Sequence, residues 1–348
     1  MKKVRVALLG CGNIANKHSI AARTIPEMEI VGLCDIRKEA FGELHAKGLS
    51  HLKKLPPTFT DAPAMYAKTK PDAVIICTPH TLHYDQCVTA LDPDLHILVE
   101  KPMVTRLSDA LDLEKRVERS GKVLSVGFNT PCTIEFQKLR DIVRSETYGK
   151  LRTVSMYLSQ PWYQHTAGTW RQDPKLSGGG QLYDSGAHPL NSLTWTVESD
   201  IAEVHAFVDR LDRKVDINGT LNIRFANGVL ASVAINGESP EGCFASFMFE
   251  RGKVDIDPWM ARWMKIEEWT GGYTARTIKY PEMPYKDSAP TPNFIDTILG
   301  RATPGTTARN GVIHSQLMDA IYDSARTGLP AKPPVAKPRV AAKRKRAA

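Results

Sequence analysis

Two different patterns of apolar residues run along the chain. In residues 1–125, short apolar runs alternate with stretches whose apolar spacing predicts helices. Strands that are buried on both faces have such continuous runs, as a parallel sheet requires. The expected strands are Val4–Leu9, Ile30–Cys34, Ala73–Cys77, Leu95–Val99 and Val123–Val126, and the expected helices are Ile14–Thr24, Arg37–Lys47 and Leu107–Arg119. This alternation predicts a doubly wound α/β domain.

The pattern changes to successive strands in residues 126–290. A linking helix is expected at Thr133–Arg144, and Asn227-Gly228 between two strands is a strong hairpin signal. The expected strands are Leu151–Leu158, Ile201–Val208, Leu221–Phe225, Val229–Ile235, Phe244–Glu250, Lys253–Ile256 and Met264–Trp269. They predict a second α/β domain, built on a mostly antiparallel open sheet, for substrate binding, catalysis and oligomerisation. In residues 291–330, Thr291–Leu299 and Thr307–Arg326 look helical, and we expect them to return to the first domain.

Net charge adds one distinction to this picture. The chain of 348 residues has a formal net charge of +8, and seven of these charges come from residues 331–348, which contain no acid. A basic segment rich in proline and alanine cannot bury apolar surface, so 331–348 is expected to be a disordered tail. The body is nearly neutral, which argues against a nucleic-acid partner apart from weak contacts by the tail.

Cysteine usage and hydropathy bear on the compartment. The six cysteines form no CxxC pair, so they predict neither a disulfide framework nor a metal site. The apolar run near the N-terminus is short and contains Arg5, so it reads as a strand and not as a signal peptide. No apolar stretch is long enough to span a bilayer. These features predict a cytoplasmic protein with no membrane partner.

A glycine-rich turn gives the first chemical signal. Gly10-Cys11-Gly12-Asn13-Ile14-Ala15 follows a strand and opens a helix, whose free N–H groups can bind a pyrophosphate. Asp35 ends the second strand, where a carboxylate can bind the adenosine ribose. Its charge would repel a 2′-phosphate and favours NAD, although Arg37 and Lys38 leave NADP open. The context predicts a Rossmann dinucleotide site.

Two further signals contain side chains suited to proton transfer and charge stabilisation. Glu100-Lys101-Pro102 follows the strand Leu95–Val99, at the sheet edge that faces a ligand; alone, it could be a surface pair. Later, Gly178-Gly179-Gly180 precedes Asp184 and His188. If this stretch is helical, the last two side chains share one face. They suit proton transfer, but a structural pair is the alternative, and no third ligand supports a metal site.

Taken together, these motifs resemble the glucose–fructose oxidoreductase, inositol dehydrogenase and MocA family from Lys3 to about Pro330. The motifs that carry the resemblance are Gly10–Ala15, Asp35, Thr78-Pro79 with His83, Glu100-Lys101-Pro102, and Asp184 with His188 after the three glycines. The resemblance implies hydride transfer between NAD(P) and a hydroxyl or carbonyl of a sugar, inositol or related compound. It also implies a homodimer or homotetramer formed through the open sheet.

The resemblance also assigns roles to residues. It makes Lys101 the active-site lysine, His188 the catalytic histidine and Asp184 its companion acid. The residues expected at the cofactor are Gly10, Gly12, Asn13, Ile14, Asp35, Arg37, Thr78, Pro79, His83, Glu100 and Lys101. Trp170-Arg171 matches a position near substrate or cofactor phosphate. Trp162, Tyr163 and Trp170 are candidates for stacking on a sugar, and core packing is the alternative for each of them.

The sequence departs from the family pattern in places. Pro189 removes a helical N–H directly after His188 and predicts a kink or an end there. Asn191 stands where many relatives have an acid, and Thr130-Pro131-Cys132 where they often have an arginine.

Alcohol oxidation needs a proton acceptor as well as a hydride acceptor. We expect His188 to take the proton, Lys101 to stabilise negative charge on oxygen, and Asp184 to orient substrate or His188; the first two could exchange roles. The alternatives are a glycosidase that uses NAD transiently and a non-catalytic NAD-sensing regulator.

Overall fold

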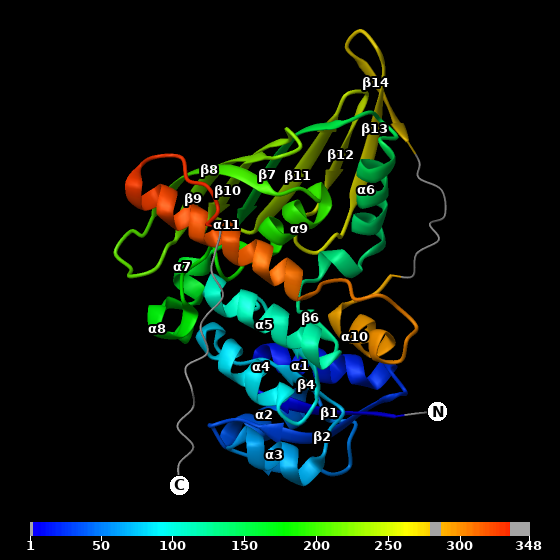
Figure 1. Cartoon of the computed structure of the whole chain (residues 1–348), viewed down its shortest axis with the longest axis vertical. Helices are drawn as coiled ribbons and strands as arrows, with labels where there is room; N and C mark the ends of the chain where they lie inside the picture. Colours follow the sequence, from blue (N-terminus) through cyan, green and yellow to red (C-terminus); the bar gives the residue numbers. More distant parts are fainter. Residues whose placement is uncertain (1–2, 279–286, 335–348) are drawn as a thin grey trace.

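The chain is described by a computed structural model that covers residues 3–278 and 287–334, in which two sheets lie at opposite ends of the molecule (Figure 1). The first sheet is entirely parallel, with the strand order β3-β2-β1-β4-β5-β6. Its strands are β1 (Val4–Leu9), β2 (Met28–Cys34), β3 (Thr58–Phe59), β4 (Ala73–Ile76), β5 (His96–Val99) and β6 (Leu124–Val126). The predicted doubly wound Rossmann sheet is confirmed.

Helices cover both faces of this sheet because its strands are apolar on both sides. One face packs on α3 (Ala62–Thr69), α4 (His83–Leu91) and α5 (Leu107–Ser120). The other face packs on α1 (Asn13–Ala21), α2 (Glu39–Lys47) and α10 (Pro290–Ile298). Phe294 and Ile295 of α10 are fully buried there, so a segment from near the C-terminus completes the helical layer beside α1 (Figure 1).

The second sheet has the order β14-β13-β12-β11-β7-β10-β9-β8 and is antiparallel except for β7 with β10. The strands are β7 (Leu151–Ser159), β8 (Ile201–Asp209), β9 (Asn218–Phe225), β10 (Leu230–Asn236), β11 (Gly242–Phe249), β12 (Gly252–Ile256), β13 (Met264–Gly271) and β14 (Thr274–Ile278). Gly228 has φ +89° between β9 and β10, a conformation that favours glycine and closes the predicted hairpin.

One face of this sheet is covered by helices, and the other is open. Along β7, β9 and β10 buried and exposed residues alternate, as expected for a sheet with one solvated face. The covering helices are α6 (Ile134–Ser145), α9 (Ala187–Val197) and α11 (Ala308–Thr327) (Figure 1). The side chains of Tyr157, Phe207 and Leu230 are exposed on the open face or its edge.

Helix α11 joins the two halves. Ala308 and Val312 in its first turns belong to the core of the parallel domain, and Leu317 and Ile321 belong to the core under the second sheet. Among the described residues, no helix is both long and apolar enough to cross a membrane.

Short helical turns connect these elements around the ends of the parallel strands. They are η1 (Ala22–Thr24), η2 (His80–Leu82), η3 (Thr130–Cys132), α7 (Trp162–His165), η4 (Trp170–Gln172) and α8 (Pro174–Ser177). Thr81 Oγ1 of η2 donates to the carbonyl oxygen of Lys175 at 2.9 Å, so the α8 segment of the second domain is docked on the first.

The prediction places the start of the disordered basic tail too early in the chain. Ala331 pairs with Val204 of β8 through two backbone hydrogen bonds of 2.8 Å and is buried. A small apolar residue that satisfies both its backbone groups on an edge strand belongs to the fold. Residues 335–348, which hold most of the predicted basic tail, lie outside the described residues.

Candidate active site

A cavity of about 760 Å³ opens at the carboxyl ends of β4 and β5, between the two domains. It brings together the end of the glycine motif and the two later motifs. The predicted site residues that line it are Gly12, Asn13, Ile14, Arg37, Thr78, Glu100, Lys101, Trp162, Trp170, Arg171, Asp184 and His188. Ligand sites of open α/β sheets are found at this edge.

The glycine motif has the backbone approach that a dinucleotide needs. Gly10 has φ +87°, and a Cβ there would lie 2.8 Å from the carbonyl carbon and oxygen of Cys77, so no other residue fits. Around Gly12 there is nothing within 4 Å of a Cβ position, which leaves open space at the start of α1. The turn therefore fits a pyrophosphate bound at the helix N-terminus.

Asp35 is held in place at the end of β2, behind the cavity lining. Its carboxylate accepts hydrogen bonds from the backbone N–H groups of Cys11 and Arg37, each at 2.8 Å. Each oxygen keeps a further lone pair, so the group can still accept from ribose hydroxyls.

His83 and Pro79 lie behind the cavity as well. Nδ1 of His83 lies 2.8 Å from the carbonyl oxygen of Pro102, and Nε2 lies 3.0 Å from the carbonyl oxygen of Thr78. His83 therefore links the segments that follow β4 and β5.

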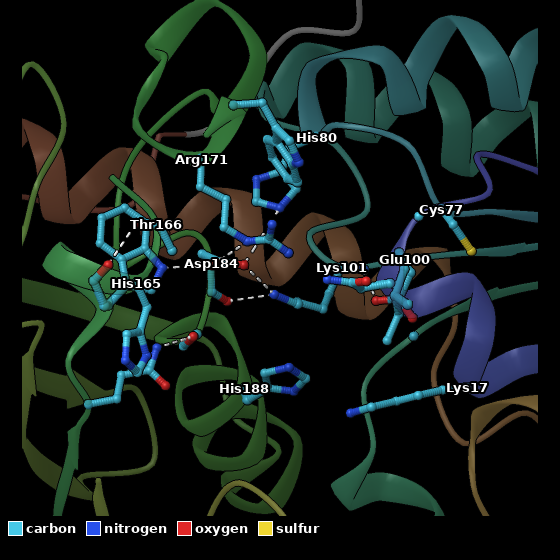
Figure 2. Close-up of a pocket in the computed structure, with 18 of the residues that line it drawn as sticks. Lys17, Cys77, His80, Glu100, Lys101, His165, Thr166, Arg171, Asp184 and His188 are labelled. Atoms are coloured by element: carbon cyan, nitrogen blue, oxygen red, sulfur yellow. Dashed lines mark hydrogen bonds and ion pairs between the residues drawn. The ribbon is translucent and has the colours of Figure 1, made fainter. Parts of the chain in front are cut away.

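Lys101 is clamped by one residue of the other domain. Its Nζ donates to Asp184 Oδ1 at 2.8 Å and to the Asp184 carbonyl oxygen at 2.9 Å (Figure 2). The other carboxylate oxygen, Oδ2, accepts from Trp162 Nε1 at 2.8 Å and from Arg171 Nε at 3.0 Å. A carboxylate with these donors is fixed in the ionised form.

The electrostatics agree with this geometry. Burial alone would raise the pKa of Asp184, but the charges of Lys101 and Arg171 outweigh it and hold the pKa far below its ordinary value. The contacts of Asp184 differ from the expected pairing with His188. No hydrogen bond joins its side chain to His188 within the described chain, and its carboxylate contacts Lys101.

The condition under which Asp184 and His188 would share a helical face is not met. Asp184 lies in a series of turns, and α9 begins only at Ala187. The turns form because the carboxylate of Asp216 accepts the N–H groups of Gly180 at 2.8 Å and Leu182 at 2.7 Å. A Cβ on Gly180 would collide with the backbone of Asp216, so this glycine allows close approach by the protein's own chain and not by a ligand.

The predicted kink at Pro189 is also wrong. Pro189 is the third residue of α9, whose helix continues to Val197. In a first turn the backbone N–H has no intrahelical partner, so proline costs little there.

His188 faces the cavity from the first turn of α9. Phe128 packs edge-on against its ring with centroids 6.0 Å apart, and Trp259 lies on another side at 6.1 Å. Its ring nitrogens form no hydrogen bond with the described residues. Burial, and secondly the charge of Lys101, lower the pKa of His188 from 6.5 to about 3. The imidazole is therefore neutral near pH 7 and can accept a proton.

Glu100 and Lys101 both line the cavity but have different side-chain partners. Glu100 is buried, and His18 Nε2 of α1 lies 2.9 Å from its Oε1. Burial would raise the pKa of Glu100, but the hydrogen bond from His18 and the nearby charges lower it. This acid ties the glycine-motif helix to the strand that carries Lys101.

The aromatic candidates separate into two groups. Trp162 and Trp170 line the cavity, whereas Tyr163 is directed away from it, with its hydroxyl on Asp212 at 2.9 Å. The guanidinium of Arg213 covers the ring of Tyr163 at 4.4 Å, so this face is not free for a sugar. The expectation for Tyr163 is wrong because the turn of α7 points adjacent side chains in different directions.

The sequence prediction missed His80 and Lys17, which also line the cavity. His80 lies beside Asp184, and Lys17 of α1 extends into the space near His188 (Figure 2). His80 follows Thr78-Pro79 directly at a strand end, a signal that could have found it. Lys17 could have been found from its helix, since it lies one turn after the glycine motif.

Comparison with known proteins gives matches over both domains. Residues 4–128 match the model of an oxidoreductase family with an NAD-binding Rossmann fold, and residues 136–255 match a GFO/IDH/MocA C-terminal domain. A D-glucoside 3-dehydrogenase of Escherichia coli is 28% identical over 354 residues, covering 93% of this chain and 96% of the relative.

Solved structures show the same fold. The WlbA dehydrogenase of Bordetella pertussis, in complex with NADH and UDP-GlcNAcA, superposes with a TM-score of 0.80 at 25% identity, over 96% of this chain and all of that one. An aldose–aldose oxidoreductase of Caulobacter crescentus gives 0.80 at 20% identity, over 95% of this chain and 100% of that one.

Proposed function

Because the chain belongs to the GFO/IDH/MocA oxidoreductase family, whose first domain binds NAD, we propose that it transfers a hydride between NAD and a hydroxyl or carbonyl of a sugar, polyol or related compound. One observation carries the proposal. Lys101 of the first domain and His188 of the second face the same cavity as the glycine motif. The names of the similar D-glucoside 3-dehydrogenase and glucose-6-phosphate 3-dehydrogenase support a sugar as substrate.

The residues divide the chemistry between them. Bound NAD supplies the hydride acceptor at its nicotinamide. Lys101, held by Asp184, donates a hydrogen bond to the substrate oxygen as negative charge develops on it. His188, which is neutral in its buried position, accepts the hydroxyl proton. Asp184 positions Lys101 and holds no proton, since its carboxylate is fully occupied by donors.

We infer a preference for NAD over NADP. Asp35 presents a carboxylate at the ribose-reading position, where a 2′-phosphate would meet its charge. Arg37 lines the cavity beside it and is the residue from which NADP binding would have to come.

Two features support further proposals about the whole molecule. The open face of the second sheet is the candidate surface for a homodimer or homotetramer, because exposed side chains there include Tyr157. All six cysteines are free thiols, the form maintained in a reducing compartment, and on this basis we propose a cytoplasmic location.

A turnover screen tests the proposed function. Aldoses, inositols, anhydrosugars and nucleotide sugars are each incubated with NAD and with NADP, and reduced nicotinamide is followed by absorbance. We expect one polyhydroxylated class to be oxidised with NAD. Release of free sugar from glycosides without net NADH would favour a glycosidase, and tight NAD binding with no turnover of any compound would favour a regulator.

A further inference from the structure

His80 is a buried cavity residue that the mechanism above does not use. It is the first residue of η2, in the segment that follows β4, with 3% of its surface exposed. Trp170 of the second domain packs edge-on against its ring, with centroids 4.7 Å apart. The ring is therefore held between the two domains at the cavity wall.

The contacts of His80 determine which nitrogen carries the proton. Its Nδ1 lies 3.0 Å from the carbonyl oxygen of Ser177, which can only accept a hydrogen bond. Nδ1 must therefore carry the hydrogen, and in the neutral ring Nε2 presents a lone pair. Burial lowers the pKa of His80 and, with the charge of Lys101, outweighs the opposing charge of Asp184, so the neutral form is favoured.

The lone pair of Nε2 has no donor in the described part of the chain. Asp184 Oδ1 lies 3.9 Å from Nε2 and is itself an acceptor, already bound by Lys101. Lys101 gives its two hydrogen bonds to Asp184 and forms none with His80. An acceptor that faces the cavity without a donor predicts a ligand with an O–H or N–H at that point.

The position of this acceptor relative to Lys101 limits the ligand. Both His80 Nε2 and Lys101 Nζ lie close to the same oxygen, Asp184 Oδ1, at 3.9 and 2.8 Å. The two nitrogens are therefore close enough for one ligand to contact both. If Lys101 holds the oxygen on the reacting carbon, a hydroxyl on a neighbouring carbon can reach His80.

We propose that His80 is a substrate-binding residue that accepts a hydrogen bond from the hydroxyl next to the reacting carbon. The substrate class is then a vicinal diol, and an isolated alcohol is a poor substrate. The inference rests on the proposed function, which supplies the reacting hydroxyl at Lys101. His80 selects the substrate and takes no part in the transfer of hydride or proton.

Two substitutions separate the two nitrogens of the ring. In His80→Asn the side-chain amide can replace Nδ1 and keep the hydrogen bond to Ser177, but nothing replaces Nε2. In His80→Gln the amide oxygen reaches the position of Nε2 and restores an acceptor. Thr81→Val is the matched control, because it removes a neighbouring hydrogen bond to the α8 segment without touching the cavity acceptor.

The assay compares kcat/KM for the best substrate of the screen with that for its deoxy analogues, one for each carbon next to the reacting one. We expect His80→Asn to lose about tenfold on the parent compound, as loss of one hydrogen bond to a neutral group does. On the deoxy analogue that lacks the hydroxyl bound by His80, the kcat/KM of the same variant should equal that of the wild type within about twofold, because neither enzyme can form that hydrogen bond. His80→Gln should retain most of the activity, and Thr81→Val should not discriminate between the compounds.

Other outcomes overturn the inference. An equal loss on the parent and every deoxy analogue, together with weaker NAD binding, would assign Nε2 to the cofactor. No loss in His80→Asn would show that the acceptor meets only water. A wild type that oxidises isolated alcohols as well as diols would refute the inference about substrate and leave the proposed function intact, whereas a wild type that oxidises nothing would refute both.

Discussion

The low pKa of His188 should be visible in the pH dependence of oxidation. An ordinary histidine base loses its activity as pH falls through about 6.5. Burial and the charge of Lys101 lower the pKa of His188 to about 3, so protonation is displaced toward acid. We therefore expect kcat/KM for alcohol oxidation to show no acid limb between pH 7.5 and about 5 that arises from this histidine.

The size of the effect follows from the fraction of neutral ring. With the ordinary pKa, only about 3% of the histidine is neutral at pH 5, whereas a pKa near 3 leaves about 99% neutral. The two cases differ about thirtyfold in the concentration of competent base at that pH. Initial rates of alcohol oxidation, measured at saturating NAD from pH 7.5 to about 5, distinguish the two cases. Enzyme incubated at each pH is returned to pH 7.5 to confirm that its activity recovers.

Removing the charge of Lys101 separates the two causes of the lowered pKa of His188, burial and the neighbouring charge. Lys101→Met removes the second contribution to the pKa of His188, and the residual activity should then develop an acid limb at higher pH than in the wild type. His188→Gln provides the control, since it should show no limb from this position. A wild-type limb near pH 6.5 that disappears in His188→Gln would refute the argument from burial.

The remaining predictions concern the clamp and the cofactor. Lys101→Met should lower kcat on the order of a hundredfold, since it removes the charge at the reacting oxygen, while NAD affinity measured by fluorescence quenching changes little. Asp184→Asn leaves the mostly buried charge of Lys101 and the partly exposed charge of Arg171 without their counter-ion. Because solvent screens Arg171, urea unfolding should show a loss of about 2–3 kcal/mol, below that of a fully buried pair, along with lowered kcat. A stability equal to wild type in that variant would contradict the clamp. Asp35→Ser should raise the KM for NAD and favour NADP relatively, with Arg37 as phosphate partner; better binding of NADP than NAD by the wild type would contradict the assignment.

The parallel domain could be predicted from sequence because burial on both faces leaves a local signature. The run Val4–Leu9 matches β1 at both ends, and Ile30–Cys34 differs from β2 by two residues at its start. The Asn227-Gly228 turn is equally local, since a positive φ requires a residue that tolerates it. In these regions, the residues that determine the conformation are the ones that adopt it.

The catalytic segment could not be predicted in the same way. The turns before α9 depend on Asp216, which binds Gly180 from 36 residues away, and the clamp joins Lys101 to Asp184 across 83 residues. No periodicity encodes such contacts. Family resemblance identified both members of the clamp as site residues but not their contact, and it paired Asp184 with His188 instead.

The clamp has a consequence for how the two domains cooperate. Lys101 has its backbone at the end of β5 in the dinucleotide domain, but both acceptors of its ammonium belong to Asp184 of the second domain. A lysine on a flexible four-carbon stem has no fixed position of its own, so the second domain determines where this charge stands. The carboxylate is itself held by Trp162 and Arg171 of that domain. The first domain holds the glycine motif, and the second contributes His188, the proposed acceptor of the substrate proton. Hydride transfer tolerates little misplacement of cofactor and substrate. The contact between Lys101 and Asp184 therefore does more than position one side chain, because it also aligns the cofactor-binding domain with the domain that carries His188.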